Sequence, residues 1–167
     1  TLLAWGGAAA LLALPAVAMR FTDEVRWTAT DFAAFGTMLA LACGGWELAV
    51  RTSRNWAYRG GAAIAVGASF LLVWVNLAVG FIGDEGNPAN LMFGGVLAVG
   101  IAGAYVARGG AAGLVRALVA TAVAQGLVGV LAVAVWDVRP VETTASVVFS
   151  ALWLASAGLF GLAAREG

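Results

Sequence analysis

The side chains best placed to do chemistry are polar residues that interrupt long apolar runs. Asn76 and Gln125 lie well inside two such runs, as do the hydroxyl residues Ser69 and Thr121. In an apolar interior, amides and hydroxyls either hydrogen-bond across contacts between helices or line a polar path. We favour packing contacts. The alternative is a passive channel or transporter for a small neutral solute, lined by Asn76 and Gln125.

Charged and nucleophilic chemistry finds little support in these residues. No Asp, Glu, Lys or Arg lies near the middle of any apolar run, which removes the usual parts of a proton relay or ion pump. The chain has no His, and Cys43 is its only cysteine, while Ser69 has no neighbouring base to activate it. We therefore expect no enzyme activity, no metal site and no cofactor. The nine basic residues form no dense patch, so we expect no nucleic-acid partner.

A polar segment at 83–90 forms the second candidate region. Glycines at both ends of its acidic pair permit tight turns, and an Asn-Pro pair is a favoured helix start. We predict that this segment forms a small polar vestibule at the outer surface. Its acidic pair could bind a divalent cation, but we favour the interpretation that these are hydrated loop charges. The candidate vestibule residues are Asp84, Glu85, Asn87 and Asn90.

Glu47 and Arg51 form a third candidate group. They are spaced i, i+4 with the acid first, which is the favourable order for an ion pair on a helix. Glu47 lies near the end of its apolar run, where it reaches the membrane interface. We predict a structural ion pair on the cytoplasmic side.

The elements that carry these residues are predicted to be transmembrane helices. Hydrophobic residues make up 62% of the 167 residues and charged residues 11%, whereas a soluble domain carries roughly a quarter charged residues. Because a span takes about 20 residues, the chain has room for one all-α transmembrane domain of six helices. We interpret the first run as a span and not a cleaved leader, with Thr30 or Asp31 capping the second helix and Asn87-Pro88 starting the fourth. The predicted spans are 2–19, 31–51, 60–82, 88–107, 111–136 and 143–164.

The distribution of arginines predicts the orientation of these spans. Six arginines fall on the side of the termini and three on the other side, and the acidic residues are skewed seven to two in the opposite sense. Because cytoplasmic loops carry the excess of basic residues, both termini are predicted to be cytoplasmic.

Small residues recur on one face of each run. The fourth run has Gly94, Ala98 and Ala102 at helical spacing, and we predict that such faces form the packing seams of the bundle. The odd runs also begin alike, with Gly-Gly-Ala-Ala at residues 6, 60 and 109. This similarity suggests three tandem helical hairpins, although biased composition mimics repeats readily.

The segment from Phe70 to Met92 contains the run WVNLAVGFIGDEGNPANLM. It resembles the signature stretch of a family of small bacterial membrane proteins, as do residues 21–27 and the turn at 55–59. The resemblance implies a multi-pass protein of the bacterial inner membrane and implies no particular activity.

Together these features predict a non-catalytic membrane protein that serves as an accessory or scaffold bundle. The channel described above is the alternative. A third hypothesis is a binder of lipids or hydrophobic ligands with a pocket beside Trp74 or Trp153. The expected partners are membrane lipids, a second copy of the chain, or another membrane protein.

Overall fold

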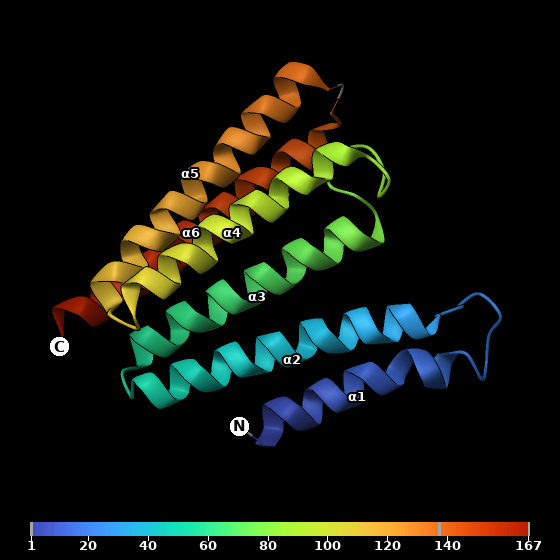
Figure 1. Ribbon diagram of the computed structural model, residues 1–167, viewed down its shortest axis with the longest axis horizontal. Coiled ribbons are helices and arrows are strands. Elements are labelled where there is room, and N and C mark those ends of the chain that lie inside the picture. Colours follow the sequence, from blue (N-terminus) through green and yellow to red (C-terminus); the bar gives the residue numbers. More distant parts are fainter. Residues whose placement is uncertain (1, 137, 167) are drawn as a thin grey trace. The chain divides into compact units, whose positions relative to one another are not determined.

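The computed structural model describes residues 2–136 and 138–166, and its described part is helical with no strand. Five helical segments are long and apolar enough to cross a membrane, with Pro88–Ala107 counted as one of them, whereas the first helix, Leu2–Ala18, has 17 residues and is shorter. In chain order the elements in Figure 1 are α1 (Leu2–Ala18), α2 (Ala29–Thr52), α3 (Trp56–Ala78), the short 3-10 helix η1 (Pro88–Asn90), α4 (Leu91–Ala107), α5 (Ala111–Val135) and α6 (Pro140–Arg165).

Helix α2 begins earlier than predicted. The Thr28 hydroxyl accepts a hydrogen bond from the Asp31 N–H, and the Asp31 carboxylate accepts from both the N–H and the hydroxyl of Thr28. This reciprocal arrangement is a capping box. The cap is therefore Thr28, and the predicted cap at Thr30 or Asp31 is wrong because Asp31 acts as the partner three residues inside the helix.

Helix α3 is shifted toward the N-terminus relative to the predicted span at 60–82. The Asn55 side chain accepts hydrogen bonds from the N–H groups of Ala57 and Tyr58, so the helix starts at Trp56. It ends at Ala78, and Gly80 then adopts a φ of 73°, a conformation that favours glycine. The next two residues continue the apolar pattern as buried loop residues and not as helix.

The starts of α4 and α6 follow from prolines. Asn87 caps η1 and Pro88 is its first residue, as predicted, and α4 proper follows from Leu91. Helix α6 starts at Pro140, before the predicted residue 143. Pro is favoured in a first turn because its missing N–H is not needed there.

The chain divides into two compact units, with the boundary between Leu48 and Ala49. The N-terminal unit is an antiparallel pair formed by α1 and the larger part of α2. A Cβ on Gly36 would lie 3.5 Å from the Leu12 side chain, and the Cys43 Sγ lies 3.6 Å from the Ala4 carbonyl oxygen. Small residues on α2 thus allow α1 to approach closely.

The second unit, from Ala49 onward, contains α3 to α6 as an up-and-down four-helix bundle. Helix α6 packs along α3 and α5, and α5 packs along α4, whereas α3 and α4 touch only slightly although they follow one another in sequence. The similar Gly-Gly segments also differ in structure. Gly60 and Gly61 lie inside α3, while Gly109 and Gly110 form the turn before α5.

Glycines set the closeness of the helices in this bundle. A Cβ on Gly103 would lie 2.6 Å from the Ala117 Cβ, and one on Gly113 would lie 2.7 Å from the Ala107 Cβ. Neither position has room for a side chain without a shift of the backbone. The α4–α5 contact is therefore a seam of small residues, the kind of contact that joins helices in membranes.

The predicted seam on α4 lies on the wrong face. Gly94, Ala98 and Ala102 are exposed, and nothing lies within 4 Å of a Cβ built on Gly94. The buried face of α4 carries Phe93 and Val96 and continues toward Gly103. Helical spacing identified a stripe of small residues but could not show which stripe is packed.

Candidate functional site

Gln125 is the most deeply placed of the predicted interior residues, with a side chain that is fully buried. Its Nε2 donates a hydrogen bond to the Ser146 Oγ at 3.2 Å, which connects α5 to α6. Gly129 makes this approach possible, because a Cβ there would lie 2.7 Å from the same Oγ. The amide therefore links two helices, as a packing contact requires.

The two hydroxyl candidates bond within their own helices. The Thr121 hydroxyl donates to the Ala117 carbonyl and the Ser69 hydroxyl to the Ala65 carbonyl, each at 2.9 Å. A hydroxyl bonded four residues back satisfies its donor without needing a neighbour or a solute.

Asn76 also turns back on its helix, donating from Nδ2 to the Leu72 carbonyl at 2.8 Å. Helix α3 packs on α6, and α5 packs on α6 and α4. Helices α3 and α5 are therefore diagonally opposite in the bundle. The Asn76 and Gln125 amides have different hydrogen-bond partners.

Three buried polar atoms in the described part of the chain have no hydrogen-bond partner there. They are the Asn76 Oδ1, the Gln125 Oε1 and the Trp153 Nε1. Each such atom costs roughly 1–3 kcal/mol when it remains unsatisfied. The interior therefore retains capacity for two hydrogen-bond donors and one acceptor.

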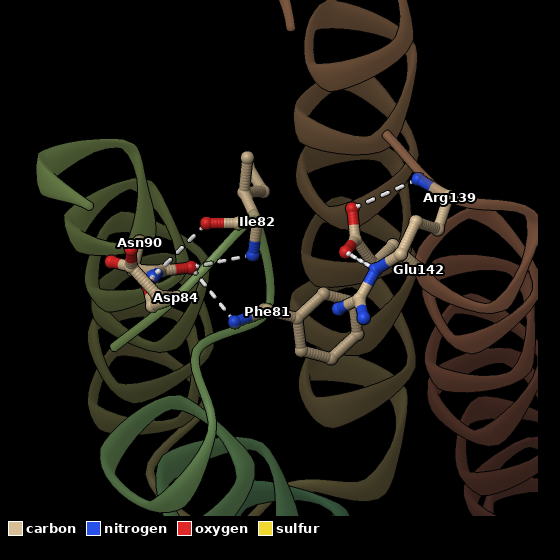
Figure 2. Close-up of polar contacts among 6 residues, drawn as sticks. All are labelled: Phe81, Ile82, Asp84, Asn90, Arg139 and Glu142. Atoms are coloured by element: carbon tan, nitrogen blue, oxygen red, sulfur yellow. Dashed lines mark hydrogen bonds and ion pairs between the residues drawn. The ribbon is translucent and has the colours of Figure 1, made fainter. Parts of the chain in front are cut away.

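The predicted outer vestibule is a folded loop that Asn90 organises. Its Oδ1 accepts hydrogen bonds from the N–H groups of Phe81 and Ile82 at 2.9 and 2.8 Å, and its Nδ2 donates to the Asp84 carbonyl at 2.7 Å (Figure 2). These bonds hold the loop against the start of α4. The side chain of Asn90 is thus occupied by the protein itself.

The other vestibule residues divide into occupied and open ones. The Asn87 side chain accepts from the Ala89 N–H at 3.0 Å, and the Asp84 carboxylate accepts from the Gly86 N–H at 3.0 Å. Glu85 is exposed next to them. The segment is a self-bonded turn in which backbone groups supply most of the partners.

This loop closes the end of the four-helix unit. Phe81 and Ile82 are 3% and 2% exposed, and the Phe81 ring centroid lies 4.4 Å from that of Phe93 and 5.6 Å from that of Phe149. A small pocket of about 10 Å³ is lined by Phe81 and Ile82 together with Glu142 and Ser146, which is about the space of one water molecule. The buried Phe81 and Ile82 side chains therefore form an apolar plug at this end.

A buried carboxylate at the same end was missed by the sequence analysis. The Glu142 Oε1 accepts from the Arg139 Nε at 2.7 Å and its Oε2 accepts from the Arg139 N–H at 3.2 Å. Figure 2 shows the Phe81 ring extending from the loop toward this pair. Glu142 lies three residues after Arg139, the residue that precedes α6, and an acid at this spacing is a capping signal. Pro140 marks the start of α6 in the sequence.

Glu47 has a recorded partner on the neighbouring helix of its unit. The Trp5 Nε1 donates to the Glu47 Oε2 at 3.0 Å. This contact places the Glu47 carboxylate against an indole N–H, and the ion pair with Arg51 stays a prediction. Among the described residues, no group of three His, Cys, Asp or Glu side chains is arranged to hold a metal ion.

Comparison with known proteins identifies no relative of this chain. No protein-family model, curated protein or solved structure matches the chain. Function must therefore be argued from the site itself. The site consists of one amide that joins α5 to α6, hydroxyls satisfied within their helices, and a loop that plugs one end.

Proposed function

We propose that this chain is a non-catalytic protein of the bacterial inner membrane that acts as an accessory or scaffold bundle. The observation that carries the proposal is the packed interior of the four-helix unit. Its polar side chains make structural hydrogen bonds, and the pocket lined by Phe81 and Ile82 has space for about one water molecule. A bundle of this kind contributes a surface, and neither catalysis nor a conduit is needed to explain its residues.

The proposed topology has six spans with both termini in the cytoplasm. Helix α1 is about 25 Å long by the helical rise, slightly less than the hydrocarbon core of about 30 Å, and it pairs with α2. The arginine distribution supports this orientation. Reporter tags fused to the two termini test this topology. Tags found on opposite sides of the membrane would contradict it.

The outer face of α4 supports self-association as the scaffold activity. Gly94, Ala98 and Ala102 are exposed at four-residue spacing on a helix that is long and apolar enough to cross a membrane when counted from Pro88. Such a stripe lets a second helix approach closely. We propose a second copy of the chain as the occupant.

A flux experiment tests the scaffold against the channel. Proteoliposomes holding the purified chain are loaded with small neutral solutes, and their release is compared with that from protein-free vesicles of the same lipids. The scaffold predicts equal release rates together with chemical cross-linking between copies. Protein-dependent release that Gln125→Leu abolishes would overturn the scaffold and support the channel.

One observation favours the channel as the second candidate. The Asn76 Oδ1 and the Gln125 Oε1 are both acceptors without a partner in the described part of the protein, so either can receive a hydrogen bond from a passing solute. The plug at Phe81 and Ile82 must then move aside. Replacement of Phe81 by Gly is expected to raise solute release if this candidate is correct.

A further inference from the structure

One end of the four-helix unit is rich in arginine. Helices α3 and α5 begin there and α4 and α6 end there (Figure 1). Glu166 is the acidic residue that the unit places at this end. We call this surface the arginine-rich end, and its basic residues are Arg51, Arg54, Arg59, Arg108, Arg116 and Arg165.

The opposite end of the same unit has the reverse character. Its described charged residues are Asp84, Glu85, Arg139 and Glu142. Arg139 is already engaged with Glu142 through two hydrogen bonds. The unit is therefore strongly polarised along its helices, with positive charge concentrated at one membrane surface.

Two of the arginines share one corner of the arginine-rich end. The Asn55 Nδ2 donates to the Glu166 Oε2 at 2.7 Å, which ties the start of α3 to the end of α6. Arg54 and Arg165 are the chain neighbours of this bonded pair, and both are exposed. The bond thus brings the chain positions of Arg54 and Arg165 together at one corner.

An aromatic side chain completes the corner. Trp56, the first residue of α3, is 66% exposed, and an exposed Trp at a helix end is typical of the level of lipid headgroups. Arginine binds phosphate oxygens in a bidentate manner. The corner therefore offers cations for a phosphodiester and an indole for the region where headgroup meets acyl chain.

We propose that the corner of Arg54, Trp56 and Arg165 binds the headgroup of an anionic phospholipid in the cytoplasmic leaflet. The proposal rests on the membrane placement proposed above and not on the scaffold role. The partner is a lipid and not a soluble phosphate, because Trp56 and the apolar helices below it accommodate acyl chains. Anionic headgroups attract each nearby arginine with an energy that corresponds to about a fivefold gain in affinity.

The test uses the full chain purified in a neutral detergent. Phosphatidylglycerol and phosphatidylcholine with identical acyl chains are titrated separately, while the midpoint of thermal unfolding is followed. Phosphatidylglycerol is expected to raise the midpoint at lower concentration than phosphatidylcholine. The two single variants Arg54→Gln and Arg165→Gln and the double variant that combines them are compared with the wild type. The apparent affinity for phosphatidylglycerol is expected to fall about fivefold for each arginine removed.

Arg20→Gln is the matched control, because Arg20 is an exposed arginine of the N-terminal unit and does not belong to the four-helix unit. It should bind phosphatidylglycerol as the wild type does. Native mass spectrometry of retained lipids gives a second readout that does not depend on the stability of the variants. Equal responses to the two lipids, or an unchanged response in the double variant, would overturn the lipid site and leave the flux result for the scaffold unaffected.

Discussion

Helix α4 carries small residues on two faces, and the structure treats these faces in opposite ways. Gly103 lies so close to α5 that a Cβ would come within 2.6 Å of the Ala117 Cβ. Gly94, on the other face, would place a Cβ in open space. The same residue type therefore sets helix separation at one position and leaves a bare surface at the other, so composition at helical spacing does not by itself identify a packed seam.

The difference has a physical origin in the neighbouring residues. Phe93 and Val96, on the packed side of α4, are 2% and 1% exposed, and their bulk fills the space between helices around the glycine contacts. Leu91 and Ile101 lie on the other side and are strongly exposed, as side chains facing lipid are in a membrane. Large and small residues together, and not the small ones alone, define the packed face.

The largest expected effect comes from filling the inner glycine. Gly103→Leu must displace Ala117 or the backbone of α5, and overpacking of this kind costs about 1–3 kcal/mol or more. Gly94→Leu is the matched control and should change the free energy of unfolding by less than about 0.5 kcal/mol. Unfolding in mixed micelles, at a dilution where the chain is monomeric, measures both, and equal losses for the two variants would contradict the distinction between the faces.

The two interior amides differ in the same way. Gln125 bonds to a side chain of another helix, whereas Asn76 bonds within its own helix. Gln125→Ala removes the link to Ser146 and is expected to cost about 2 kcal/mol. Asn76→Ala removes a bond within α3 and should cost less than about 1 kcal/mol. A double-mutant cycle between Gln125 and Ser146 gives the coupling directly, and a coupling of zero would show that their hydrogen bond contributes nothing.

The outer face of α4 is tested by association and not by stability. Gly94→Leu is expected to weaken the proposed dimer about tenfold, which is about 1.4 kcal/mol, because its bulk would separate two helices that approach through this stripe. Ala112→Leu, at an exposed position near the start of α5, is the control. Energy transfer between labelled copies in vesicles measures both, and no loss of transfer in Gly94→Leu would move the interface elsewhere.

The smallest expected effect is at Trp153. Its Nε1 has no hydrogen-bond partner among the residues that the structure describes, although the side chain is 2% exposed. Trp153→Phe removes an unsatisfied donor, which offsets the loss of buried ring area, and the free energy of unfolding should change by about 0.5 kcal/mol or less. A loss above about 2 kcal/mol would mean that the indole N–H has a partner, such as a buried water, in solution.

The sequence predicted the helical architecture more successfully than the contacts. Asn87 and Pro88 are found where capping chemistry put them, and the apolar run of α5, predicted at 111–136, ends at Val135. The errors arose where side chains act on the backbone. Asn55 capped α3 earlier than predicted, and Gly80 ended it before the apolar pattern stopped.

The contacts of the candidate site needed the fold. Ser146 became the partner of Gln125 because α5 and α6 run antiparallel with Gly129 between them, a register that no spacing in one helix reveals. Asn90 was expected to face a vestibule, but its amide is used by the backbone of Phe81 and Ile82. The contacts inside the four-helix unit are therefore determined by which helices pack together and in which register.

Cysteine labelling tests the closed interior most directly. In a Cys43→Ala background, single cysteines replace Ser69, Asn76, Thr121 and Gln125, and a membrane-impermeant thiol reagent is applied from each side. Glu85→Cys, in the exposed loop, is the positive control and should label fully. A packed bundle predicts that all four interior positions resist labelling from both sides, whereas labelling in a continuous track from Asn76 to Gln125 would contradict it.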